Sequence, residues 1–141
     1  MVRTGTKELR DPHSYITFDD IFALALAKTK STKFVADTNT WQRVLYAVHE
    51  KYKEKIPELK MMFFDESRSH LPPQSDEFYQ LINILSASKL IGLPNPTYER
   101  ILMEASQKER ARNLEEKLLE HYEKYIEEIA KMLEERLGVD S

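Results

Sequence analysis

The sequence feature that most limits the fold is a pair of prolines, Pro94 and Pro96, that stands between two apolar runs. In one interpretation Asn95 caps a helix that has Pro96 at its first position, and this helix runs on to Leu137. In the other, the prolines form the turn of a β-hairpin with strands over residues 90–93 and 97–104. The sequence of residues 106–109, S-Q-K-E, is a capping box, which marks the start of a new helix. The hairpin is therefore favoured, with the single helix as the alternative.

Upstream of this point the sequence predicts three helices, over residues 18–29, 41–56 and 76–89. Each follows a residue whose side chain can cap a helix: Thr17, Thr40 and Ser75. The second has the clearest apolar face, because its apolar residues recur at intervals of three and four. A last helix is predicted from Gln107 to Leu137, which is followed by a glycine.

These elements define a mainly α fold. We expect a winged-helix-like domain of three helices and a short β-hairpin over residues 16–104. A flexible arm, residues 1–15, precedes this domain, and a long C-terminal helix lies within residues 105–141.

The predicted C-terminal helix has a wide apolar stripe, and a helix of about 46 Å is longer than a small domain can cover. Some of its apolar residues are spaced alternately four and three apart, the spacing with which helices pack on one another. The sequence therefore predicts a homodimer that forms through this helix, with packing of the stripe on the domain itself as the alternative. The predicted interface residues are Leu118, Tyr122, Tyr125, Ile129 and Met132.

Composition indicates a soluble globular protein, with 141 residues of which 41% are apolar and 32% charged. The longest apolar run, Ile21 to Ala27, is far shorter than the ~20 residues that a membrane-spanning helix needs. The N-terminus has no apolar leader and the chain has no cysteine. We therefore expect a cytoplasmic protein that does not enter a membrane.

Catalytic motifs are missing from the sequence. The four histidines do not share a metal-ligand spacing, and three glycines are too few for a glycine-rich phosphate loop. Without cysteine there is no thiolate nucleophile or thiolate metal site. We expect a protein that is not an enzyme and needs no cofactor or metal.

Residues 72–103, PPQSDEFYQLINILSASKLIGLPNPTYERILM, resemble the third helix and wing of winged helix-turn-helix domains. The order of proline, serine, helix and a leucine–isoleucine pair is similar to that in YwgA- and SocA-like proteins. The resemblance implies a regulator that binds double-stranded DNA, or an antitoxin-like module that binds a protein partner without DNA.

For DNA binding, the side chains that could read bases or hold phosphates are Lys33, Arg68, Gln80, Asn83, Lys89 and Arg100. Gln80 and Asn83 can pair with adenine, and the basic residues can contact phosphates. The charge distribution argues against this role, because Asp76 and Glu77 make the start of the third helix acidic. Residues 1–60 carry a net charge of +3, whereas residues 61–103 carry −2 and residues 104–141 carry −4. A protein-interaction adaptor is the alternative.

Overall fold

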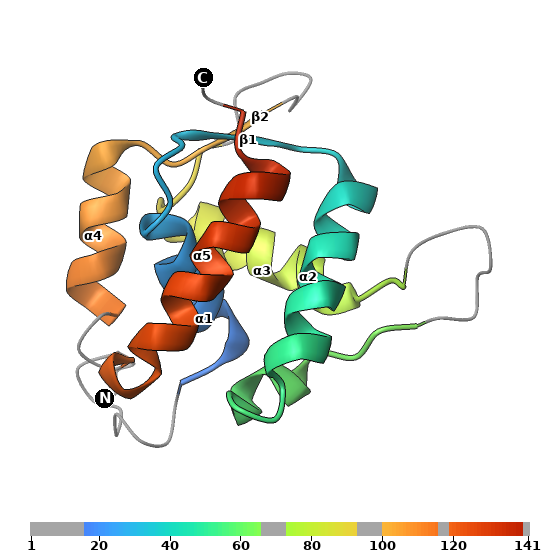
Figure 1. Cartoon of the computed structure of the whole chain (residues 1–141). Helices are drawn as coiled ribbons and strands as arrows, with labels where there is room; N and C mark the ends of the chain where they lie inside the picture. Colours follow the sequence, from blue (N-terminus) through green and yellow to red (C-terminus); the bar gives the residue numbers. More distant parts are fainter. Residues whose placement is uncertain (1–15, 66–72, 93–99, 116–118, 140–141) are drawn as a thin grey trace.

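The computed structural model describes residues 16–65, 73–92, 100–115 and 119–139. It is mainly helical, with one small antiparallel sheet (Figure 1). In chain order the elements are α1 (Phe18–Ala27), β1 (Lys33–Val35), α2 (Thr38–Tyr52), the 3₁₀ helix η2 (Pro57–Met61), α3 (Asp76–Ala87), β2 (Arg100–Leu102), α4 (Ala105–Glu115), the 3₁₀ helix η3 (Glu120–Tyr122) and α5 (Glu123–Leu137).

Helix α1 is the centre of the core. Every residue of the helix except Asp19 is buried, and α3, α4 and α5 all contact it. Its dense run of alanine, leucine, isoleucine and phenylalanine explains this position, because a helix that is apolar on all sides must be covered on all sides. At its start, the backbone N–H of Thr17 donates to the Asp20 carboxylate (3.0 Å), which caps the first turn.

Of the next two α-helices, one has the predicted cap and the other does not. Ser75 caps α3 as predicted, because its Oγ accepts the N–H of Glu77 (3.2 Å). Helix α2 begins earlier than predicted, at Thr38, and its cap is Asp37, whose carboxylate accepts the N–H of Thr40 (2.9 Å). Asp37 has a pKa below its usual value because both the hydroxyl and the backbone N–H of Thr40 donate to it.

The sheet joins segments that are far apart in the chain. Strand β1 pairs with β2, with Phe34 opposite Ile101, and Leu102 also exchanges two backbone hydrogen bonds with Gly92 (2.7 and 2.9 Å). Residues 100–102 are thus extended, which excludes the single helix from Pro96 to Leu137. The Gly92–Leu102 pair lies where the hairpin was predicted, although its turn, residues 93–99, is outside the described residues. Strand β1 lies between the first two predicted helices, in a segment for which the sequence predicted no strand.

The predicted helix from Gln107 to Leu137 is wrong, because the structure has two α-helices there, α4 and α5, with η3 before α5. Both α4 and α5 contact α1, and Figure 1 shows α4 to the left of α1 and α5 in front of it. The start is shifted as well: the side chain of Gln107 accepts the N–H of Glu104 (2.8 Å), and α4 begins at Ala105. Two shorter helices can both bury apolar side chains on α1, whereas one straight helix could not.

The described residues of the apolar stripe that was predicted as a dimer interface pack in or against the core of their own chain. Ile129 is fully buried within its own chain, and Tyr122, Tyr125 and Met132 pack against the same core. Leu118 lies outside the described residues. The helix α5 contacts α1 and α2, so the surface on which the homodimer was predicted is largely used inside one chain.

Polar groups from α4 and α5 converge on the C-terminal end of α1. Arg112 Nη1 donates to the carbonyl of Ala27 (2.8 Å), and Lys108 Nζ donates to the carbonyl of Thr29 (2.5 Å). From the other side, the carboxylate of Glu134 accepts the N–H of Lys30 (2.6 Å), the N–H of Ser31 (3.0 Å) and the Ser31 hydroxyl. These contacts satisfy backbone groups that a buried helix end could not expose to water.

A glycine makes the Glu134 contact feasible. A Cβ on Gly138 would lie 2.5 Å from Ser31 Oγ and 2.8 Å from the carbonyl of Glu134, closer than real side chains approach. The next residue continues the sheet, because the N–H of Val139 donates to the carbonyl of Lys33 (3.0 Å). The end of α5 is therefore tied both to the turn after α1 and to β1.

The Glu134 carboxylate should make stability depend on pH. Partial burial raises its pKa, but hydrogen bonds from Ser31 and Lys30, with the charge of Lys108, outweigh this and lower the pKa below the usual 4.5. A lowered pKa contributes stability that is complete above pH 4.5 and is lost as the pH falls through the folded-state value. We expect Glu134→Gln to cost about 1 kcal/mol at neutral pH, because a neutral amide accepts weaker hydrogen bonds and Glu134 is partly exposed.

The measurement is urea unfolding across a pH series, with Glu135→Gln, an exposed neighbour on the same helix, as the control. The difference between wild type and Glu134→Gln should shrink below pH 4.5, while Glu135→Gln should follow the wild type throughout. A gap between wild type and Glu134→Gln that stays constant with pH would contradict the assigned role.

Candidate binding surface

The start of α3 is held firmly against α2. The side chain of Gln42, which is fully buried, accepts the N–H of Ser75 (3.0 Å) and donates to the carbonyl of the same residue (3.1 Å). Below this pair, Phe78 packs on Trp41 with the ring centroids 5.9 Å apart. The two hydrogen bonds and the aromatic contact fix both the position and the direction of α3.

Residues 62–65, which follow η2, alternate in burial, as an extended segment does on a surface. Met62 and Phe64 are buried, and Phe64 lies against the rings of Tyr46 and His49, with centroid distances of 5.3 and 5.0 Å. Phe63 points the other way and is 72% exposed. Buried neighbours on both sides therefore hold Phe63 in an outward position.

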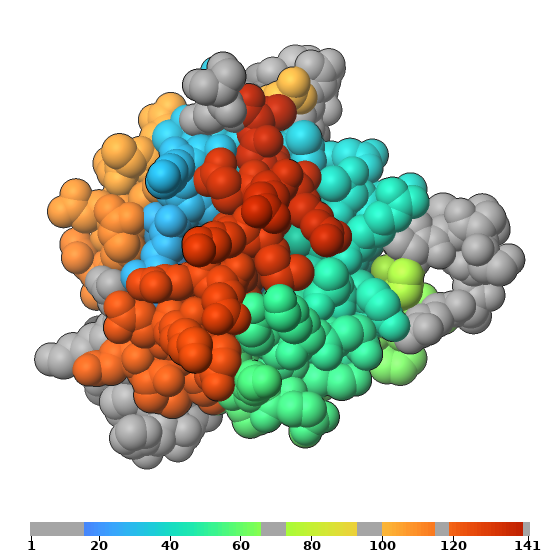
Figure 2. Space-filling model, viewed as in Figure 1, coloured from blue at the N-terminus to red at the C-terminus, as the bar shows by residue number. Residues whose placement is uncertain are grey.

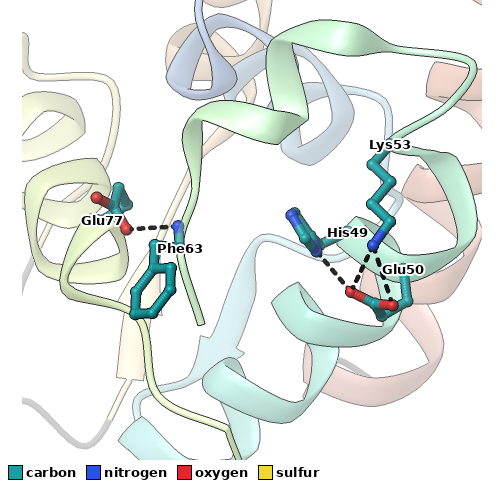
Figure 3. Close-up of polar contacts among 5 residues, drawn as sticks. All are labelled: His49, Glu50, Lys53, Phe63 and Glu77. Atoms are coloured by element: carbon teal, nitrogen blue, oxygen red, sulfur yellow. Dashed lines mark hydrogen bonds and ion pairs between the residues drawn. The ribbon is translucent and has the colours of Figure 1, made fainter. Parts of the chain in front are cut away.

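The side chain of Glu77 joins this segment to α3. Its Oε1 accepts the backbone N–H of Phe63 (3.0 Å) and also the hydroxyl of Ser75 (2.7 Å). Figure 3 shows the first contact beside a second polar group on α2, where the Glu50 carboxylate meets His49 Nδ1 (2.9 Å) and Lys53 Nζ (3.3 Å). The pKa of Glu50 is lowered, first by the His49 hydrogen bond and then by Lys53.

Large apolar side chains gather at the surface here. Four such side chains are exposed in the described part of the chain, and three of them, Met61, Phe63 and Tyr79, come from the end of η2, from the extended segment and from α3. Tyr79 is 51% exposed and its ring packs edge-on against Phe78 at 5.0 Å. We call Phe63, Tyr79 and the hollow between them the aromatic patch.

The hollow in the aromatic patch has a volume of about 340 Å³. Three of its lining side chains are carboxylates, and none of the described residues that line it is lysine or arginine. The lining residues are Phe63, Asp65, Gln74, Ser75, Asp76, Glu77 and Tyr79. Backbone hydrogen bonds between Asp65 and Gln74 (2.6 and 2.9 Å) close one side of it.

A second, larger hollow of about 740 Å³ lies between α4 and α5, above the end of α1. Figure 2 shows residues that follow α1 reaching the surface between these two helices. The residues that line this larger hollow include Arg112 and Glu134, which already form hydrogen bonds with the end of α1 and the turn after it. Charges of both signs line the remainder, so this hollow does not select a ligand of one charge.

The residues predicted for DNA binding are divided between two places. Gln80 and Asn83 are exposed on α3. Lys33 and Arg100 are exposed on the outer face of the sheet, because Phe34 and Ile101 between them are buried. Arg68 lies outside the described residues.

Lys89, the remaining predicted residue, ends α3 in a left-handed conformation with φ of 61°. The N–H of Leu90 donates to the carbonyl of Leu85 (2.9 Å) and that of Lys89 to the carbonyl of Ser86 (3.0 Å). This is a Schellman motif, in which glycine usually occupies the left-handed position. A lysine at this position therefore carries a conformational free-energy cost in the backbone.

Sequence reasoning missed the aromatic patch. Residues 61–64 lie between the second and third predicted helices, and Tyr79 is not among the residues that were predicted to bind a partner. The only signal was the succession of four apolar residues in a polar region, which does not reveal that alternate ones point outward.

Among the described residues, no group of three or more histidine, aspartate or glutamate side chains is placed to hold a metal ion. None of the described helices is long and apolar enough to cross a membrane. No family model matches the chain, and neither the curated proteins nor the solved structures contain a significant match.

The left-handed conformation of Lys89 can be tested by a pair of substitutions that both remove its charge. We expect Lys89→Gly to be more stable than Lys89→Ala by about 1 kcal/mol, because only glycine adopts this conformation without a steric cost. Thermal and urea unfolding of the two variants measure the difference directly. Equal stability of the two variants would show that the backbone at residue 89 is not strained.

Proposed function

We propose that the chain is a non-catalytic protein-binding module, an adaptor, and that the aromatic patch is its binding surface. The observation that carries the proposal is the exposure of Phe63 (72%) and Tyr79 (51%) beside one hollow. Burying such rings in water-free contacts with a partner is favourable by roughly 25 cal/mol for each Å² of apolar surface. Aromatic side chains in a hollow are also the residues that most often dominate protein–protein binding energy.

The order of elements supports a winged-helix-like arrangement for this module. From α1 to β2, the α-helices and strands follow in the order helix, strand, helix, helix and strand. The last strand, β2, lies between β1 and Gly92. In this arrangement α3 corresponds to the helix that faces the ligand. Its inner face packs on α1 and α2, so Tyr79, Gln80 and Asn83 are presented outward from a fixed base.

The polar groups at the patch support binding rather than catalysis. Ser75 and Glu77 are engaged with each other, with the helix cap and with the N–H of Phe63. A serine or glutamate that acts in catalysis needs a partner that activates it and a reacting group within reach. Here their hydrogen bonds hold the backbone that displays the aromatic rings.

A peptide-display library, selected against the wild-type protein, tests this function. We expect the selected peptides to bind Phe63→Ala/Tyr79→Ala at least about tenfold more weakly, because these two rings are the anchors. Leu114→Ala is the matched control, since Leu114 is an exposed apolar residue (45%) on α4. If the selected peptides bind the double variant as well as the wild type, the aromatic patch is not the binding surface and the proposal is wrong.

Double-stranded DNA is a second candidate, favoured by the strained lysine at the end of α3. Lys89, Lys33 and Arg100 are exposed at the end of α3 and on the sheet, while Gln80 and Asn83 are exposed on the helix. Three phosphate contacts give a slope of log affinity against log salt of about −2.7, a weak dependence for a DNA-binding protein. The acidic start of α3 opposes contact with phosphates at its other end.

Fluorescence anisotropy with a labelled duplex at several salt concentrations decides this second candidate. Arg100→Ala and Lys89→Gly should each reduce the steepness of the slope by about 0.9, since each removes one phosphate contact. Lys55→Ala is the control, because Lys55 is exposed beyond the end of α2 that lies away from the sheet. Affinity that is independent of salt, or unchanged in both variants, would rule out DNA binding through these residues.

A further inference from the structure

We infer that the partner of the aromatic patch is a short, basic protein segment, and that one of its lysine or arginine side chains enters the hollow. This inference rests on the proposed function and adds the chemistry of the partner. Two features of the patch carry it: the sign of the charges that line the hollow and the arrangement of the two aromatic rings.

The charged side chains among the described residues that line the hollow have one sign. Asp65, Asp76 and Glu77 contribute carboxylates, and no described residue of the lining is lysine or arginine. The N-terminal end of α3 opposes this with a partial positive charge equivalent to about +0.5. The carboxylates of Asp76 and Glu77 alone outweigh half a positive charge, so the described lining attracts cations and repels anions. Asp76 is exposed in the first turn of α3, where a ligand can reach it.

The rings supply the second part of the recognition. A lysine or arginine side chain has an apolar stem and a charged end, and both parts find a partner here. The stem can pack on Phe63 and Tyr79, which are 72% and 51% exposed, while the charged end approaches the carboxylates. Aromatic faces also attract cations directly, with about 0.5–1 kcal/mol at an exposed site.

The size and rigidity of the hollow favour a side chain over a larger ligand. Its volume of about 340 Å³ is near the lower limit for small-molecule pockets, about 300 Å³. Phe63 is fixed by its N–H bond to Glu77 and by buried Met62 and Phe64 on either side. A surface that is already ordered loses little conformational entropy on binding, which favours a short segment with few contacts.

Labelled synthetic peptides test the charge preference. The probes are three short peptides in which leucine alternates with lysine, with glutamine or with glutamate, and binding is measured by fluorescence anisotropy. We expect the lysine peptide to bind about tenfold more tightly than the glutamine peptide and the glutamate peptide to bind weakest. Added salt should weaken binding of the lysine peptide alone, because ion pairing contributes only there.

Substitutions in the protein identify the residues that cause the preference for the lysine peptide. Asp76→Asn should weaken binding of the lysine peptide about tenfold and leave binding of the glutamine peptide unchanged. Glu123→Gln is the matched control, because Glu123 is an exposed carboxylate in the first turn of a different helix, α5. Phe63→Ala should weaken binding of the lysine peptide and of the glutamine peptide by the same factor, because both peptides pack on the aromatic rings. Circular dichroism and melting temperature confirm that each variant is folded.

The outcomes separate this inference from the proposed function. If the lysine and glutamine peptides bind equally and both lose affinity in Phe63→Ala, the patch binds protein segments without preference for basic ones, and only this inference is overturned. The same holds if the lysine peptide does not bind at millimolar concentration while library peptides bind through the patch. If neither synthetic nor selected peptides respond to Phe63→Ala/Tyr79→Ala, both are wrong.

Discussion

The fold depends on how the C-terminal end of a buried helix is satisfied. Helix α1 is covered on nearly every side, so the carbonyl of Ala27 and the turn after it must find partners inside the protein. Arg112 on α4 and Glu134 on α5 provide them from opposite sides. A backbone polar group left unpaired in such a place costs about 1–3 kcal/mol. The same contacts therefore close the helix end and set where α4 and α5 lie.

The first half of the fold could be predicted because its signals are local. Ser75 caps the helix that it was expected to cap, and apolar spacing located the buried faces of α2 and α3. The C-terminal region was harder, since Ile129 has the same spacing whether α5 packs on a second chain or on α1. Strand β1 was missed because three residues carry little pattern, and their pairing with β2 is decided by residues about 65 positions away in the sequence.

The binding surface was less accessible to prediction than the fold. Gln80, Asn83, Lys33 and Arg100 are exposed, but exposure of polar side chains is the usual case. The unusual feature is an exposed phenylalanine, and its exposure follows from burial of the residue on each side. Phe64 is buried against Tyr46 and His49 of α2, so this relation cannot be obtained from a single stretch of sequence.

The double use of the Glu77 carboxylate has a consequence for dynamics. Because one oxygen holds both the hydroxyl of Ser75 and the N–H of Phe63, fraying of the first turn of α3 and detachment of residues 61–65 are coupled events. Any molecule that packs on Phe63 only while the segment is attached will also slow the fraying of the helix, by mass action. Occupancy of the surface would thus be visible as protection of backbone amides in α3 that the bound molecule never touches.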